Sequence, residues 1–163
     1  ETAWEVVVQA AGTGTPTGSG VAVSEATYTA TGLGVGSYEV YVRANCDTNG
    51  FSSWVGPVNF QLLDCPVLNF PADAATGVAV DGGVITFEWD AVANATGYDF
   101  MIGTSPTTLA LVDTVTELEI PITGFTYNTT YYWSVYPVGS GGTPTACASF
   151  SFTTQGPPAN DVC

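Results

Sequence analysis

Apolar and polar residues alternate along much of this chain, most clearly between Thr123 and Val138. From Tyr131 the side chains alternate between two faces, one with Tyr131, Trp133 and Val135 and the other with Tyr132, Ser134 and Tyr136. A period of two residues predicts a half-buried strand. Phe125, the turn residues 126–130 and Tyr131 together form the pattern of a tyrosine corner, in which a buried ring bonds back to the chain through its hydroxyl.

The same alternation predicts strands throughout the chain. They cover Trp4–Gln9, Val21–Val23, Thr27–Ala30, Tyr38–Ala44, Val55–Leu62, Val78–Val80, Val84–Asp90, Gly97–Gly103, Leu109–Thr114, Glu117–Ile120 and Ala146–Thr153. In the fourth of these strands we expect Tyr38, Val40 and Val42 on one face, and Glu39, Tyr41 and Arg43 on the outward face. We expect Leu118 and Ile120 to point inward, and Trp4, Trp89 and Trp133 to lie in cores.

Composition supports an all-β chain and restricts its partners. The 163 residues are 45% hydrophobic and 10% charged, with one Lys or Arg, no His and a net charge of −14. Few strong helix formers are present, while Thr, Val, Tyr and Gly are abundant. So acidic a chain repels nucleic acids and anionic membranes, and no apolar run is long enough to insert into a bilayer. We find no signal-peptide pattern, and we expect that a segment preceding Glu1 was removed or lies outside these residues.

The stretch from Cys65 to Gln155 carries about seven short strands, and it resembles a fibronectin type III domain. Trp89 stands where that family keeps its second-strand Trp, and Phe125 and Tyr131 stand at its corner. The first part resembles the same family around Leu33–Ala44, with a corner one residue shorter. The resemblance implies an all-β fold of two consecutive fibronectin type III-like (immunoglobulin-like) antiparallel sandwiches. We expect a partial domain at 1–63, a complete domain at 64–155, and a linker with the start of a further module at 156–163.

The two repeats are out of phase. Trp4–Gln9 matches Tyr98–Gly103, the third strand, and Tyr38–Cys46 matches Tyr131–Gly139, the sixth. The first domain therefore lacks its first two strands, which leaves a core face uncovered and edge groups unpaired. Either the chain is a fragment of a longer array, or another chain donates the missing strands.

Four cysteines are present without metal-binding spacing. The resemblance implies that Cys65 and Cys147 meet at one end of the second sandwich and form a disulfide. Cys46 and Cys163 would then have partners outside these residues, whereas a Cys46–Cys65 bond would have to span the length of a strand. The alternative is four reduced thiols in a cytosolic protein.

The residue types argue against an enzyme. Without His, no Ser-His-Asp or Cys-His arrangement can form. The carboxylate pairs Glu88 with Asp90, and Glu117 with Glu119, could serve glycosidase chemistry, but that chemistry also needs a cleft, and we interpret them as parts of a solvated sheet face. We expect no cofactor. Calcium is a weak alternative, with Asn45, Asp47 and Asn49 in one loop and Asp81 in another as its oxygen ligands.

Exposed aromatic residues form a second candidate site. Tyr41, Trp54, Tyr132 and Tyr136 could stack on sugars or pack on neighbouring protein. Two N-glycosylation sequons, at Asn94 and Asn128, matter only in a eukaryotic secretory route. Asp113-Thr114-Val115 resembles an O-glycosylation acceptor of Bacteroidetes, with Thr114 as the modified residue.

The chain as a whole resembles the tandem modules of large secreted adhesins of Bacteroidetes. This resemblance implies an extracellular or cell-surface stalk module without catalysis, with neighbouring modules, glycans or surface proteins as partners. The alternatives are a carbohydrate-binding or enzyme-accessory module, and a filament subunit completed by strand donation.

Overall fold

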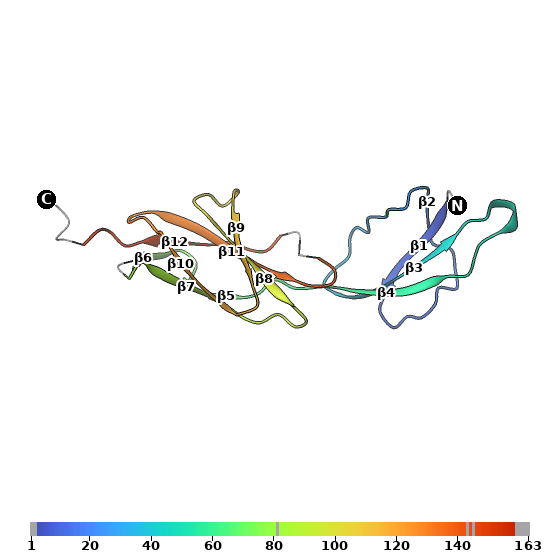
Figure 1. Cartoon of the computed structure of the whole chain (residues 1–163), viewed down its shortest axis with the longest axis horizontal. Helices are drawn as coiled ribbons and strands as arrows, with labels where there is room; N and C mark the ends of the chain where they lie inside the picture. Colours follow the sequence, from blue (N-terminus) through green and yellow to red (C-terminus); the bar gives the residue numbers. More distant parts are fainter. Residues whose placement is uncertain (1–2, 81, 143, 145, 159–163) are drawn as a thin grey trace. The chain divides into compact units, whose positions relative to one another are not determined.

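The computed structural model describes residues 3–80, 82–142, 144 and 146–158. Within these residues the chain consists of β-strands and one short 3-10 helix, and it divides into two compact units, Glu1–Leu62 and Leu63–Cys163 (Figure 1). The all-β class predicted from the alternation is confirmed. We call the two parts unit 1 and unit 2.

Unit 1 is a single antiparallel sheet in the order β2-β1-β3-β4 (Figure 1). Its elements are β1 (Trp4–Ala10), β2 (Val21–Val23), β3 (Gly36–Ala44), the 3-10 helix η1 (Asp47–Asn49) and β4 (Val55–Leu62). The strand expected at Thr27–Ala30 does not form. The described part of unit 1 has no second sheet with which this segment could pair, so its backbone has no ladder to join.

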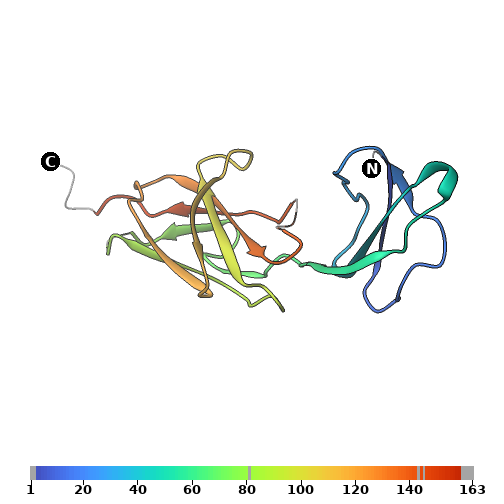
Figure 2. The same ribbon diagram turned by 45° about the vertical axis from the view of Figure 1, so that its right-hand side comes forward.

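Unit 2 is a two-layered sandwich (Figure 2). One sheet has the order β10-β7-β5 and the other β6-β12-β11-β8-β9. The strands are β5 (Leu68–Phe70), β6 (Ala75–Val78), β7 (Val84–Trp89), β8 (Gly97–Gly103), β9 (Ala110–Val115), β10 (Glu119–Thr123), β11 (Thr130–Val138) and β12 (Phe150–Thr154). The first strand is divided, because the chain leaves β5 at Pro71 and β6 then joins the other sheet, parallel to β12. The last strand begins at Phe150 rather than at Ala146.

Aromatic rings fill the core of unit 2. Phe87 is fully buried, and its ring centroid lies 4.8 Å from that of Phe100 and 5.0 Å from that of Trp133. These tilted and edge-on contacts are the geometries that aromatic pairs prefer. Leu118, expected inward, is 41% exposed. It precedes β10, and its carbonyl accepts the Trp89 N–H at 3.1 Å while its side chain faces solvent.

Both units contain a tyrosine corner. The Tyr131 hydroxyl accepts a hydrogen bond from the Thr126 N–H at 3.1 Å, and Phe125 packs edge-on against the Tyr131 ring. In unit 1 the Tyr38 hydroxyl donates to the Gly34 carbonyl at 2.9 Å. The corner of unit 1 spans four residues and that of unit 2 spans five, as the sequence predicts.

The two units share one strand register. Between β1 and β3 the opposed pairs are Val8 with Val40, Val6 with Val42 and Trp4 with Ala44. Between β8 and β11 they are Ile102 with Trp133, Phe100 with Val135 and Tyr98 with Pro137. Each unit also has one stacked pair of rings between its last two strands. The ring centroids of Tyr38 and Phe60 are 5.4 Å apart, and those of Tyr131 and Phe152 are 5.6 Å apart. Strands β1, β2, β3 and β4 therefore correspond to β8, β9, β11 and β12.

Candidate functional site

The outward face of the unit 1 sheet is buried, contrary to the sequence prediction. Glu5 is 7% exposed, Glu39 is 4% exposed and Tyr41 is 4% exposed. The loop between β1 and β2 supplies hydrogen bonds to both carboxylates, and the ring of Tyr41 packs against the backbone of β4 at Gly56. A Cβ at Gly56 would come within 2.8 Å of the Tyr41 ring, so only glycine allows this contact.

Glu5 is held by the one cationic side chain of the protein. The Arg43 guanidinium donates to Glu5 Oε2, with its Nε at 2.8 Å, and the Gly20 N–H donates at 3.2 Å. Burial alone raises the pKa of Glu5, but the hydrogen bonds from Arg43 and Gly20 outweigh it, so the pKa lies below its ordinary value. Arg43 also stacks on the rings of Phe51 at 4.2 Å and Trp54 at 4.3 Å, in cation–π geometry.

Glu39 orders the loop that follows β1. Its carboxylate accepts hydrogen bonds from Gln9 Nε2 at 2.8 Å, the Gly14 N–H at 3.0 Å and the Gly12 N–H at 3.2 Å. The bond from Gln9 is the main reason that the pKa of Glu39 lies below its ordinary value. Both carboxylates thus have hydrogen-bond donors from within unit 1, and through them the cluster fixes the loop between β1 and β2 on the sheet.

The predicted aromatic platform is not assembled as expected. Tyr41 is buried, which corrects the prediction that it is exposed, and the ring of Trp54 is covered by Arg43. Tyr132 and Tyr136 are half-buried on the outward face of β11. Between them Ser134 is fully buried, and its hydroxyl donates to the Ala148 carbonyl at 2.8 Å. The segment before β12 therefore covers the middle of that face.

The opposite face of the unit 1 sheet is only partly covered: Val6 is 8% exposed, and residues 25–28 line a groove on this face. Trp4, Val6, Val40 and Val42 line the same groove of about 390 Å³, and Val58 lies directly opposite Val40 on β4. Val42 is 38% exposed, whereas Val135, at the same position in unit 2, is wholly buried. Trp4, expected in a core, is accordingly only half-buried.

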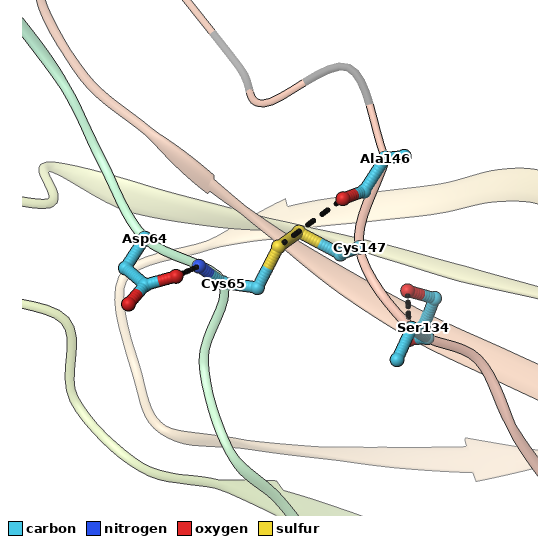
Figure 3. Close-up of a disulfide and its surroundings, with 6 residues drawn as sticks. Asp64, Cys65, Ser134, Ala146 and Cys147 are labelled. Atoms are coloured by element: carbon cyan, nitrogen blue, oxygen red, sulfur yellow. Dashed lines mark hydrogen bonds between the residues drawn. A yellow bond between two sulfur atoms is a disulfide. The ribbon is translucent and has the colours of Figure 1, made fainter. Parts of the chain in front are cut away.

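The predicted disulfide is present in unit 2. Cys65 and Cys147 are bonded, with their α-carbons 5.5 Å apart (Figure 3). The Asp64 side chain accepts the Cys65 N–H at 2.8 Å (Figure 3). Cys46 is half-buried and has no disulfide partner among the described residues, and Cys163 lies outside them.

Three of the four carboxylates in the predicted pairs line one depression on unit 2: Glu88, Glu117 and Glu119. Glu88 lies directly opposite Glu119 across β7 and β10, in a broad depression beside Trp89. The Asp90 side chain accepts a hydrogen bond from Asn69. The Glu117 carboxylate accepts hydrogen bonds from the Glu117 backbone and from Thr116, and these bonds lower the pKa of Glu117. A glycosidase acid needs a raised pKa, so Glu117 is unsuited to that role.

The weaker site predictions remain untested. Of the residues suggested as calcium ligands, Asn45 accepts the Asp47 N–H through its side chain at 3.0 Å, and Asn49 is exposed. Asp81 lies outside the described residues. Among the described residues, no three His, Cys, Asp or Glu side chains form a group that could hold a metal ion. Asn94 and Asn128 are exposed at positive φ, which Asn tolerates well and which accounts for their presence in turns. Thr114 is exposed on β9, where its hydroxyl donates to Asp99 at 2.6 Å.

Comparison with known proteins identifies the fold. No family model matches the chain, and no curated protein matches it. The crystal structure of chicken CNTN1 FN1-FN3 domains superposes on 94% of this chain with a TM-score of 0.50 at 15% identity, and the chain spans 56% of its length. A second similar structure is the solution structure of the sixth fibronectin type III domain from human fibronectin type III domain containing protein 3. The match covers 64% of this chain and 94% of that domain, with a TM-score of 0.46 at 15% identity. The chain has a fibronectin type III-like all-β fold, which is a two-sheet sandwich in unit 2 and a single sheet in the described part of unit 1. Among the described residues, no helix has the length and apolar character needed to cross a bilayer.

Proposed function

We propose that this chain is an extracellular structural and adhesive module of a repeat array on a secreted or cell-surface protein, with no catalytic activity of its own. The observation that carries the proposal is the shared register of the two units. One four-strand pattern with a tyrosine corner occurs twice in 163 residues, which is the organisation of a chain built from repeated units.

The disulfide supports an extracellular, load-bearing role. Disulfides persist in oxidising compartments outside the cytosol. The Cys65–Cys147 bond closes a segment of 82 residues, so it locks most of unit 2 against extension. The net charge of −14 further disfavours nucleic acids as partners.

Single-molecule stretching of unit 2, pulled from its two ends, tests the mechanical role. A locked segment of 82 residues cannot extend, and its release adds roughly 290 Å at about 3.5 Å per residue. We expect this length gain only after reduction of the disulfide. A full-length extension of the oxidised chain would contradict a disulfide-locked stalk.

The adhesive role is tested separately, by display of the chain on inert beads. We expect the beads to adhere to protein-coated surfaces and not to polysaccharides. Polysaccharide binding that is lost in Tyr132→Ala, but kept in the matched Tyr28→Ala variant in unit 1, would favour the carbohydrate-binding alternative.

A further inference from the structure

The loop between β1 and β2 is tied to the sheet of unit 1 near both of its ends. After β1, the Glu39 carboxylate accepts hydrogen bonds from the Gly12 N–H at 3.2 Å and the Gly14 N–H at 3.0 Å. Before β2, the Glu5 carboxylate accepts the Gly20 N–H at 3.2 Å. Each carboxylate thus binds the backbone of the loop, so the attachment depends on the charge of two side chains that belong to the sheet.

We call residues 11–20 the strap. Pro16 and Gly20 are half-buried, and the other residues of the strap are exposed. A Cβ added at Gly18 would meet no atom within 4 Å, so no other part of the chain packs on the strap there. A loop that buries little apolar surface opens at low cost in free energy. Polar tethers therefore contribute most of what holds the strap in place.

The two tethers leave the strap little slack. Gln9, which lies opposite Glu39 in the ladder between β1 and β3, is four residues from Glu5, about 13 Å at the usual rise. The chain from Gly14 to Gly20 covers six residues and can span at most about 22 Å. The strap must therefore stay close to β1 between its tethers.

We propose that the strap is a cover released by acid: Glu5 and Glu39 hold it on the sheet only while they are ionised, and their protonation frees it while β1 and β3 stay paired. Val7 and Tyr41 lie directly opposite each other between the two tethers. Tyr41 is 4% exposed and Val7 is half-buried, so release of the strap would raise the exposure of both. The inference goes beyond the proposed function and does not depend on it.

The chemistry of a carboxyl group gives the direction of the effect. An ionised carboxylate only accepts hydrogen bonds, and these bonds are stronger than those to a neutral acceptor, whereas a protonated carboxyl gives up part of its accepting capacity. The hydrogen bond from Gln9 is the main reason that the pKa of Glu39 lies below its ordinary value of 4.5. Burial raises the pKa of Glu5, but the hydrogen bonds from Arg43 and Gly20 outweigh it. Both tethers are therefore complete above pH 4.5 and are lost as the pH falls through the folded-state pKa values.

Few other charged or titratable groups share this face. Arg43 lies opposite Glu5, and Tyr41 lies on β3 between Arg43 and Glu39. On β4, Asn59 lies opposite Glu39. Neither the strap nor β2 contains a charged residue. The acid response of the strap thus depends on the two carboxylates that bind it.

The other two carboxylates in the described part of unit 1 lie elsewhere. Glu25 lines the groove on the opposite face, and Asp47 begins η1 after the end of β3. Both are exposed. We therefore expect their protonation to leave the strap in place.

Exchange of backbone amide protons with water, measured by NMR on the 163-residue chain at pH 7, tests the tethers without acid. The double variant Glu5→Gln/Glu39→Gln keeps the shapes of both side chains and leaves each with one neutral oxygen as acceptor. We expect the Gly12 and Gly14 amides to exchange at least tenfold faster, while the amides paired between β1 and β3 keep their rates. Glu88→Gln is the matched control, because it removes the same charge from an exposed strand position in unit 2, and it should exchange like the wild type.

Backbone order parameters of the wild-type chain measure the release itself, and they decide the matter even if the double variant does not fold. We expect the order parameters of the strap to fall from about 0.85 at pH 7 to below about 0.6 at about pH 3. The midpoint should lie below pH 4.5, and the amide shifts of Gly12, Gly14 and Gly20 should move with it. The order parameters of β1 and β3 should stay near their values at pH 7.

Two results would overturn the proposal. The first is a strap that exchanges at the wild-type rate in a folded double variant, or that keeps its order parameters at about pH 3, because the carboxylates then do not hold it. The second is a loss of order in the strap, β1 and β3 together as the wild type is acidified, because unit 1 then opens as a whole. Neither measurement involves adhesion or stretching, so failure here is distinct from failure of the proposed function.

Discussion

Removal of the Cys65–Cys147 bond should strongly destabilise unit 2. The bond joins residues 82 positions apart, and the loop-closure model gives about 4.5 kcal/mol at 25 °C for a loop of that length. Small domains are stable by only about 5–15 kcal/mol, so the loss takes a large share of the total. We expect the Cys65→Ala/Cys147→Ala double variant to lose about 3–5 kcal/mol of unfolding free energy.

Urea unfolding followed by tryptophan fluorescence measures this loss, because Trp89 and Trp133 are buried in the core of unit 2. With a slope of about 1.5 kcal/mol per molar urea, the midpoint should fall by roughly 2–3 M. Cys46→Ala is the matched control, since it removes a thiol that forms no disulfide in the described structure, and it should leave the midpoint in place. Reduced wild-type chain should behave like the double variant. A midpoint shift below about 0.5 M would refute the reasoning that chain entropy dominates the contribution of this bond.

Three further predictions follow from single side chains. Tyr131→Phe removes the corner hydrogen bond to the Thr126 N–H and should lower the unfolding free energy of unit 2 by about 1–2 kcal/mol in urea; an unchanged midpoint would contradict it. Phe87→Ala empties the centre of the aromatic core and should cost about 3–5 kcal/mol by the same assay; a loss under 1 kcal/mol would mean that the core collapses to fill the space. Glu5 should titrate below its ordinary pKa of 4.5, so the stability that it adds to unit 1 is complete above that pH and is lost as the pH falls through the folded-state pKa. Carbon-detected NMR of the Glu5 carboxyl measures this pKa, and a value at or above 4.5, or no change in Arg43→Met, would show that the Arg43 bond does not stabilise the charged form.

Much of unit 2 could be predicted from its sequence. The run around Trp133 has the period of a strand whatever surrounds it, and Phe125 to Tyr131 has the spacing of a corner, so both follow from local chain geometry. The Cys65–Cys147 pairing required the further step of resemblance to a sandwich, because the two residues meet only when the strands between them are folded.

The candidate sites were less predictable, and Tyr41 shows why. Its alternation with Val40 and Val42 correctly placed it on the outward face of β3, but outward was taken to mean exposed. The sequence carries no local signal that the loop following Gln9 would fold back onto that face through Glu39, or that Gly56 would bring β4 close to the ring.

The sequence by itself determined the strand period, the two corners and the repetition of one four-strand pattern, because each depends on residues close together in the chain. Only the tertiary structure decided how far each face of the unit 1 sheet is covered. Burial depends on what lies above a face: the outward side received a hydrogen-bonded loop and Arg43, while the apolar side received no second sheet among the described residues. Alternation specifies two sides of a strand, but contacts between distant segments determine which side is shielded from water.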